Sequence, residues 1–493
     1  MYWTDSETKR IEVASLEKNR FTGGMDRKVL VWAELDLPRA IALAPEDGLM
    51  FWSDWGQIPK IEATSMDGDP ASRVTLVDSD IGWPNGITLD HDSKTLFWVD
   101  AKTHQISSVD WRSGRNRRVV LGTEDALPQP FAVSFFRGAL YWSDWTTRSL
   151  HMYNASHVDP LASPQKIRLR GSKLDPMDMK VFEPSRQLLG SNGTSPFDPC
   201  EDNPCSHLCL LASGAPGGYR CACNTGILLA DEATCRDEFT SVLLLAKRDD
   251  IRKISLDMPD FTDIVVEMDY GDRGDNTSAG EARSSIAVGY DPVDRLVYWT
   301  DQFSGIHRAT LDGKGAEGFI VKEVDHPDGV YVDYLGRNLY WTDTFYDRIE
   351  VARLDDPENR KVLISRGLDE PRALVLDPSA GLMFWSDWGD AARIERAWMD
   401  GSHRGVIVDT DIGWPNGMAI DVQEKKVYWC DAKTDRIEVC DYDGSGRRVV
   451  LDDVLPHPFG LTLLGDYLYW TDWHEHVVQR ADKVSREWTN YQF

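Results

Sequence analysis

Residues 340–343 read Tyr-Trp-Thr-Asp, and this pattern of an aromatic residue, tryptophan, a variable residue and aspartate recurs along the chain. The signatures start at Tyr2, Phe51, Phe97, Tyr141, Tyr298, Tyr340, Phe384, Tyr428 and Tyr469. Except across one cysteine-rich segment, successive signatures lie 41 to 49 residues apart, which is the length of one β-propeller blade. Alternating apolar residues between turn residues predict strands at 39–43, 49–54, 60–65 and 73–77 within one repeat. Each repeat is therefore predicted to be a four-stranded antiparallel meander, with the signature tryptophans packed between blades.

The length and charge of the chain narrow the range of functions. Its 493 residues, 42% of them hydrophobic, are too many for a single core and suggest about three domains. The formal net charge of −27 disfavours nucleic acid and anionic membrane surfaces as partners, and it mildly favours basic ligands. The sequence contains no apolar run long enough to span a membrane.

Six of the eight cysteines lie between Cys200 and Cys235 with the spacing C-x4-C-x3-C-x11-C-x-C-x11-C. So short a segment buries little core, and disulfides formed in an oxidising compartment would stabilise it. A zinc site is disfavoured because paired C-x2-C knuckles are missing and the segment holds one histidine, His207. The other two, Cys430 and Cys440, are expected on adjacent strands without facing each other, so we predict two buried free thiols.

Other features indicate an extracellular fragment. Asn154, Asn192 and Asn276 each begin an Asn-x-Ser/Thr triplet and are candidate glycosylation sites. The chain starts inside a repeat and has no leader-like segment, so we interpret it as part of an ectodomain that is cut at both ends. By comparison of its two halves, the first ring lacks roughly two N-terminal blades and is expected to be unstable, and the second stops just before a closing strand.

Strand order predicts where a ligand would bind. In a meander of strands a to d, the link from d into the next a and the turn from b to c lie at the same end of the blade. Because strand a is innermost, the links gather around the axis of the ring. In the first ring this end presents Arg39, Trp55, Trp83, Asn85, Phe131, Trp145 and Met177. In the second ring it presents Asp328, Arg372, Trp388, Trp414, Asn416, Phe459 and Trp473.

These residue types favour a protein or peptide ligand, because clustered tryptophan, arginine and amide groups are typical of interface hot spots. The alternative is that the rings of Phe131 and Phe459 only plug the axis. Asn85 and Asn416, which both follow a Trp-Pro pair, could hold a ligand amide, since their side chains donate and accept. The following glycines are expected to form the turn. The second copy belongs to the more complete ring and is expected to be the better site.

The signatures resemble the YWTD repeats of the low-density-lipoprotein receptor family. This resemblance implies an all-β fold of two six-bladed propellers, the first truncated at its N-terminus, over 1–188 and 240–493. Between them, 197–236 resembles an EGF-like module. That resemblance implies the disulfides Cys200–Cys209, Cys205–Cys221 and Cys223–Cys235. The segment 197–199 lacks the pattern of calcium-binding modules, so no metal is expected.

Trp-Pro-Asn-Gly in both rings, the EGF-like module between them, and the segments 243–246 and 261–265 narrow the resemblance to the Wnt co-receptors. These are the low-density-lipoprotein-receptor-related proteins five and six and arrow. Such a receptor ectodomain would bind Wnt proteins and their antagonists on the propeller faces, and a Frizzled-type receptor through Wnt. Asn85 would contact the asparagine of an Asn-x-Ile ligand motif. No catalysis and no cofactor are implied.

The chain departs from that group in two places. Gln129 replaces a histidine that His457 keeps in the second ring. The long link 269–285 carries Arg273-Gly274-Asp275, which matches an integrin-type tripeptide but is better explained as a chance match.

Two alternatives remain open from the residues. Propellers also host hydrolases and lactonases, but no catalytic signature of the Gly-x-Ser-x-Gly or His-Glu-x-x-His kind occurs. The other alternative is a different protein with the propeller and EGF-like combination, either another endocytic receptor of the low-density-lipoprotein receptor family or a matrix protein similar to nidogen.

Overall fold

The computed structural model describes residues 1–19, 25–155, 164–168, 175–181, 198–224, 227–236, 241–258, 260, 262–266, 268, 284–453 and 455–492. The chain forms two compact units, Met1–Ser241 with Ser255–Thr262, and Val242–Ile254 with Asp263–Phe493. Within the described ranges, no helix is long and apolar enough to cross a membrane.

The first unit contains one three-stranded sheet, three four-stranded sheets and two small hairpins within its described part. The sheets are formed by β1 (Tyr2–Asp5), β2 (Arg10–Lys18) and β3 (Met25–Val31); β4 (Pro38–Ala44), β5 (Leu49–Asp54), β6 (Lys60–Ser65) and β7 (Val74–Val77); β8 (Pro84–Asp90), β9 (Thr95–Asp100), β10 (Gln105–Asp110) and β11 (Arg118–Leu121); and β12 (Pro130–Phe136), β13 (Ala139–Asp144), β14 (Ser149–Asn154) and β15 (Gln165–Arg168). The hairpins are β16 (Leu208–Leu211) with β17 (Tyr219–Ala222), and β18 (Ile227–Leu228) with β19 (Cys235–Arg236). Short 3-10 turns are η1 (Pro45–Asp47), η2 (Pro70–Ser72) and η4 (Pro216–Gly218).

The second unit begins with a three-stranded sheet, and five four-stranded sheets follow. They are formed by β20 (Val242–Ala246), β21 (Ile251–Ser255) and β22 (Asp263–Val265); β23 (Ser285–Asp291), β24 (Leu296–Asp301), β25 (Gly305–Thr310) and β26 (Glu317–Ile320); β27 (Pro327–Asp333), β28 (Asn338–Asp343), β29 (Arg348–Arg353) and β30 (Arg360–Ile364); β31 (Pro371–Asp377), β32 (Leu382–Asp387), β33 (Arg393–Trp398) and β34 (Gly405–Val408); β35 (Pro415–Asp421), β36 (Lys426–Asp431), β37 (Arg436–Asp441) and β38 (Arg448–Leu451); and β39 (Pro458–Leu464), β40 (Tyr467–Asp472), β41 (Val477–Asp482) and β42 (Trp488–Gln492).

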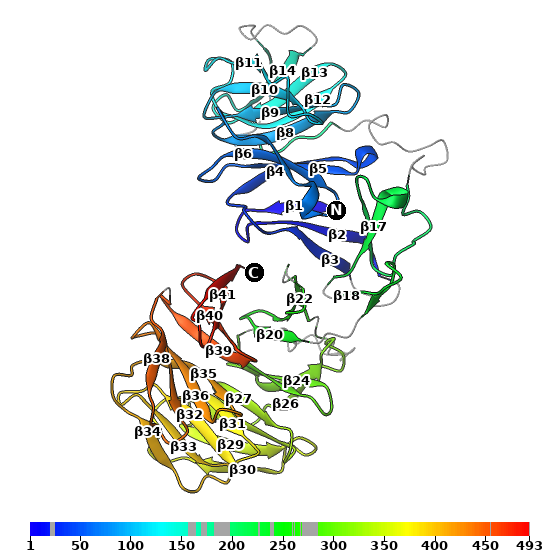
Figure 1. Ribbon diagram of the computed structural model, residues 1–493. Coiled ribbons are helices and arrows are strands. Elements are labelled where there is room, and N and C mark those ends of the chain that lie inside the picture. Colours follow the sequence, from blue (N-terminus) through cyan, green and yellow to red (C-terminus); the bar gives the residue numbers. More distant parts are fainter. Residues whose placement is uncertain are drawn as a thin grey trace. The chain divides into compact units, whose positions relative to one another are not determined.

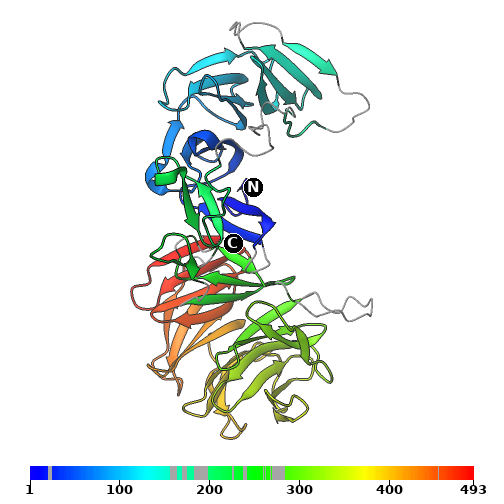
Figure 2. The same ribbon diagram turned by 90° about the vertical axis from the view of Figure 1, so that its right-hand side faces the viewer.

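Every four-stranded sheet is an antiparallel meander in chain order, so the predicted blade is confirmed. The first strands of successive blades lie side by side: β4 with β8, β8 with β12, and the series β23, β27, β31, β35 and β39. Strand a of each blade is thus innermost, which places the links between blades around the centre of each ring. Figure 1 and Figure 2 show the sheets from two sides. The fold is all-β and has propeller architecture, as the repeat predicts.

The signature tryptophans form the core between blades. Eight of them, Trp52, Trp98, Trp142, Trp299, Trp341, Trp385, Trp429 and Trp470, are at most 1% exposed. Each lies on strand b, where it packs against residues of the neighbouring sheet. The ninth, Trp3, is only half-buried, because β1 is the inner edge of a three-stranded sheet. The expectation that all nine are core residues is therefore wrong for Trp3.

The cysteine-rich module belongs to the first unit. Its disulfides are Cys200–Cys209, Cys205–Cys221 and Cys223–Cys235, so the pairing implied by the EGF-like resemblance is confirmed. Leu208 and Leu210 of β16 pack into the same apolar cluster as Trp52. Arg220 forms ion pairs with Asp67 and Asp69, both at 3.0 Å. The module therefore packs directly against the first ring.

Cys430 and Cys440 are free and fully buried, as predicted. Cys430 pairs across the strands with Ile437, and Cys440 pairs with Val427, so the two thiols do not face each other. Burial raises the pKa of each thiol to about 12.

Candidate ligand-binding face

The turn after each signature is tied to the link that enters the same blade. The Trp55 N–H donates to the Leu37 carbonyl at 3.2 Å, and the Trp388 N–H donates to the Glu370 carbonyl at 3.1 Å. The signature carboxylate of Asp387 accepts two further N–H groups of that link at 3.1 and 2.8 Å. Links and b-to-c turns therefore lie at one end of each blade, and the strand-order prediction is confirmed. The repeated aspartates are structural acceptors of backbone N–H groups.

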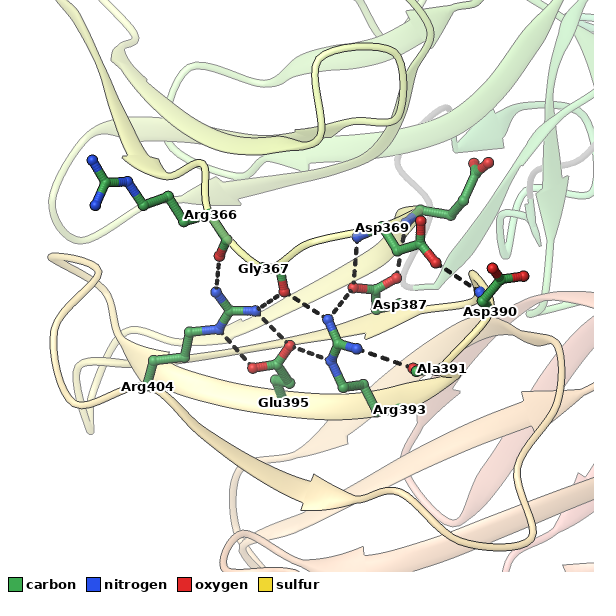
Figure 3. Close-up of polar contacts among 10 residues, drawn as sticks. Arg366, Gly367, Asp369, Asp387, Asp390, Ala391, Arg393, Glu395 and Arg404 are labelled. Atoms are coloured by element: carbon green, nitrogen blue, oxygen red, sulfur yellow. Dashed lines mark hydrogen bonds and ion pairs between the residues drawn. The ribbon is translucent and has the colours of Figure 1, made fainter.

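Arginines at the start of strand d hold the same links from the other side (Figure 3). Arg404 donates to the Glu395 carboxylate at 2.6 and 2.7 Å and to the Gly367 carbonyl at 2.6 Å. Arg393 donates to Glu395 at 2.8 Å and to Asp387 at 2.8 Å. Burial opposes the charged form of Glu395, but these hydrogen bonds outweigh it and lower the pKa of that carboxyl. Corresponding arginines bond the other links: Arg73, Arg117, Arg360 and Arg447.

Arg39 lies at the centre of the first face, between aromatic rings. Its guanidinium carbon is 4.8 Å from the ring centre of Trp55 and 5.0 Å from that of Phe131. Phe131 stacks on Trp145 with ring centres 4.4 Å apart, and Trp55 meets Trp83 edge-on at 6.3 Å. The Arg39 Nε is buried and has no hydrogen-bond partner within the described chain. Burial lowers the pKa of Arg39.

Trp145 and Met177 are joined through the link that follows β15. The Trp145 Nε1 donates to the Pro176 carbonyl at 3.0 Å, and the Ser143 hydroxyl donates to the Met177 carbonyl at 3.0 Å. The Met177 side chain is 60% exposed beside them. This arrangement fixes the Trp145 ring and leaves the methionine open to solvent.

Asn85 offers an acceptor to this face. Its Nδ2 donates to the Pro130 carbonyl at 3.0 Å, whereas its Oδ1 accepts no hydrogen bond from any described residue. Asn85 and Gly86 are part of strand β8 and have negative φ, so the expected turn is wrong. Gly86 is required for another reason: a Cβ there would lie 2.8 Å from the Phe131 carbonyl of the next blade. The glycine allows two inner strands to approach closely.

The second face repeats the aromatic part of this arrangement. The Arg372 guanidinium carbon is 4.1 Å from the ring centre of Trp388 and 5.4 Å from that of Phe459. Phe459 stacks on Trp473 at 4.1 Å. Trp414 is 42% exposed, as is its counterpart in the first ring.

The polar part differs between the two rings. Arg372 Nε donates to the Asp328 carboxylate at 3.1 Å, and its Nη1 donates to the Asn416 Oδ1 at 2.8 Å. Asn416 Nδ2 donates to the Pro458 carbonyl at 3.1 Å, so both ends of this amide are used, and the residue is 6% exposed. Asp328 is likewise 6% exposed, and burial raises the pKa of its carboxyl despite Arg372. In the second ring, arginine, aspartate and asparagine satisfy one another.

The second face includes His457, the histidine whose place Gln129 takes in the first ring. His457 lies between Trp414 and Trp473, with ring centres 6.3 and 5.7 Å away. Gln129 at the same place in the first ring supplies no aromatic ring. The stack of the second ring is therefore longer by one residue.

Sequence reasoning missed four aromatic residues on the second face: Phe303, His326, Phe345 and Tyr346. They follow signature aspartates or precede a strand-a proline, as do the tryptophans that were found. Their short distance from a signature aspartate or a strand-a proline was the signal from which they could have been predicted.

Some predicted positions cannot be placed on the face. Asn192, Asn276 and the tripeptide Arg273-Gly274-Asp275 lie outside the described residues. Asn154 is exposed at the end of β14, which is compatible with glycosylation. Among the described residues, no group of three or more His, Cys, Asp or Glu side chains could hold a metal ion.

Comparisons with known proteins agree with this architecture. The family described as low-density lipoprotein receptor repeat class B matches residues 1–43, 48–91, 337–378, 381–422 and 425–463. Low-density lipoprotein receptor-related protein 5 of Mus musculus is 48% identical over 489 residues, which cover 98% of this chain and 28% of that protein. The chain belongs to the low-density lipoprotein receptor-related protein family. It is therefore a member of a receptor family and not an enzyme.

Two further matches differ in extent. The Homo sapiens protein of the same name is 48% identical over 478 residues, which cover 96% of this chain and 28% of that protein. The chain thus spans about a quarter of the length of these relatives. A chain in a solved nidogen/laminin complex is 32% identical with a TM-score of 0.47, and the match covers 51% of this chain and 93% of that one.

Proposed function

We propose that this chain is the extracellular ligand-binding part of a cell-surface Wnt co-receptor. Membership of the receptor family supports this proposal. Three disulfides in the module support an oxidising, extracellular location. The ligands are Wnt proteins and antagonists that carry an Asn-x-Ile motif, bound at the ends of the blades where links and b-to-c turns meet.

One observation carries the proposal: the polar groups at the centre of the first face are not satisfied by the chain itself. The buried Arg39 Nε has no partner within the described chain, and the rings of Trp55 and Phe131 lie over its guanidinium. The Oδ1 of the half-buried Asn85 accepts no hydrogen bond from a described residue. A buried polar group without a partner costs about 1–3 kcal/mol, which a ligand that supplies the partner removes. A ligand amide can donate to the Asn85 Oδ1, and an aliphatic side chain next to it can pack on the rings.

The same reasoning favours the first face over the second for an asparagine-containing ligand. In the second ring, Asn416 already uses both ends of its amide. Asn416 is also only 6% exposed, so a ligand would have to move Arg372 to reach the remaining lone pair of the Asn416 Oδ1. We therefore expect the first face to be the better site for this ligand, although the second ring is the more complete one.

Binding to a purified Wnt protein and to a synthetic peptide containing Asn-Ala-Ile tests the proposal. Asn85→Ala is expected to weaken peptide binding about tenfold, because one hydrogen bond to the ligand is lost. Asn416→Ala is the matched control in the other ring, and we expect it to leave peptide affinity within about twofold. The site assignment is refuted if both variants are secreted and bind the peptide as the unaltered chain does. Absence of Wnt binding by the unaltered chain would refute the co-receptor function.

A further inference from the structure

Four aromatic rings form an exposed strip on the second unit, beside the centre described above. Phe303 follows β24, His326 precedes β27, and Phe345 and Tyr346 follow β28. Ring centres lie 6.3 Å apart for Phe303 and His326, 6.1 Å for His326 and Phe345, and 5.1 Å for Phe345 and Tyr346. Phe303 is 73% exposed and Phe345 60% exposed. Contiguous exposed rings of this kind mark interaction surfaces on soluble proteins.

The fold does not require these rings. The b-to-c turns of the first unit have the same backbone framework, with the signature aspartate accepting N–H groups of the turn. At the position of Phe345 they carry Lys102 or Thr146, and at the position of Tyr346 they carry Thr103 or Thr147. A polar residue is therefore sufficient for the turn, and the aromatic residues of the second unit need another explanation.

Carboxylates flank the strip. Asp325 precedes His326 and accepts from its Nδ1 at 2.6 Å, and Asp347 directly follows Tyr346. Asp369 and Glu370 lie on the next link; within the described ranges, neither forms an ion pair with a lysine or arginine, nor does Asp347. Among the described arginines, Arg348 covers one face of Tyr346 at 4.3 Å and pairs with Glu350 at 2.8 Å.

Electrostatics at the rim favour a cation. Burial and repulsion from Asp369 raise the pKa of Asp347. Burial raises the pKa of Glu370 despite the attraction of Arg372, and repulsion from Asp347 and Asp369 adds to the rise. A bound positive charge would relieve this repulsion, and it would also be attracted to the faces of the neighbouring rings.

We propose that the strip of Phe303, His326, Phe345 and Tyr346 is a docking surface for a basic peptide segment of a partner protein. Arginine or lysine side chains of the segment stack on the rings and pair with the rim carboxylates, and aliphatic side chains between them cover the exposed phenylalanines. The inference rests on the proposed function in one respect, because the strip lies at the same end of the blades, and it names the ligand chemistry of the second face. It uses neither the Asn85 centre nor the identity of a Wnt ligand.

A fluorescein-labelled peptide of alternating arginine and leucine tests the surface by anisotropy with the full chain. The variant Phe345→Thr/Tyr346→Thr copies Thr146-Thr147 of the first unit, so the turn is expected to fold. We expect this variant to weaken binding about tenfold. Phe303→Ser is a second, independent variant, for which we expect about threefold weakening.

Trp398→Ser is the matched control, since Trp398 is 49% exposed at the opposite end of its blade. It is expected to leave affinity unchanged. A peptide of alternating glutamate and leucine is expected not to bind. The proposal is overturned if the arginine peptide does not bind the unaltered chain. It is equally overturned if folded ring variants bind as tightly as the control, since the attraction would then be general to an acidic protein. Binding of the Asn-Ala-Ile peptide, measured in parallel, reports on the first face and separates the two proposals.

Discussion

Replacing the central arginine of each ring by methionine should have very different consequences in the two units. In the second unit, Arg372→Met leaves the 6%-exposed Asp328 without its cation and leaves the Asn416 Oδ1 without a donor. Breaking a buried pair in this way costs about 3–5 kcal/mol. In the first unit, Arg39→Met loses stacking of about 1 kcal/mol on Trp55. It also removes a buried donor that has no partner, so the net change should be under about 1 kcal/mol.

Hydrogen exchange resolved by peptide is the suitable assay, because a chain of two units does not unfold in a single two-state step. Amides of the inner strands β31 and β35 report on the second unit, and those of β4 and β8 report on the first. Arg372→Met should accelerate exchange in the second unit by a factor of about 150 to 5,000, which corresponds to about 3–5 kcal/mol. Arg39→Met should change exchange in the first unit less than about fivefold.

The pH dependence of the stability loss in Arg372→Met provides a second test. Burial raises the folded-state pKa of Asp328 above its ordinary 3.8, and removing Arg372 raises it further. A carboxyl with a raised folded-state pKa binds its proton more tightly in the folded chain. Its contribution is complete below the unfolded pKa and is lost as pH rises through the folded pKa. The loss caused by Arg372→Met should therefore be smallest in acid and largest near neutrality.

Two outcomes would contradict this reasoning. Equal losses from Arg39→Met and Arg372→Met would mean that the partners of Arg372 contribute nothing beyond stacking. The double variant Arg372→Met/Asp328→Leu should recover most of the loss, because neither charge remains buried. A double variant as unstable as Arg372→Met would show that the uncompensated Asp328 is not the cause.

Two more predictions concern the second unit. Cys430 and Cys440 should resist alkylation at pH 8 in the native chain and react only on unfolding, because burial raises both pKa values to about 12. The unfolding free energy should also decline from about pH 9 toward pH 12, since the thiols ionise first in the unfolded chain. Labelling of either thiol in the folded chain would contradict the burial. Arg404→Ala should cost about 2–4 kcal/mol in hydrogen exchange of β31 and β33, and it should weaken the stability that Glu395 supplies above its unfolded pKa of 4.5. Arg366→Ala is its control, because Arg366 contributes only a backbone carbonyl to the network in Figure 3; an equal loss from both would refute the assignment.

The strands of each repeat could be predicted because the alternating pattern that forms them lies within a short stretch of sequence. The pattern around Phe51 predicts strands that differ from β4 to β7 by at most one residue at either end. Strand order alone then placed Trp55 and Arg39 at the same end of the blade. The EGF-like resemblance gave the disulfide pairing, since spacing by itself left several connectivities open.

Other features depended on neighbours in space. Gly86 looked like a turn residue, but it lies in a strand and is needed because the next blade passes within contact distance of it. The exposed strip around Phe345 was missed because Phe303, His326 and the adjacent pair Phe345 and Tyr346 lie about twenty residues apart in the sequence, and only the ring brings Phe303 and His326 beside Phe345.

The amino-acid sequence by itself determined the blade, the inner position of strand a and the tryptophans and phenylalanines around the centre of each face. These follow from periodicity and alternation within about forty-five residues. Only the tertiary structure decided that Asn416 is committed to Arg372 while Asn85 keeps a free acceptor. The two loops are identical in sequence, and the difference comes from Asp328, which holds Arg372 from another blade of the second ring. Electrostatic pairing between distant residues acts through space, so identical loops can present different chemistry.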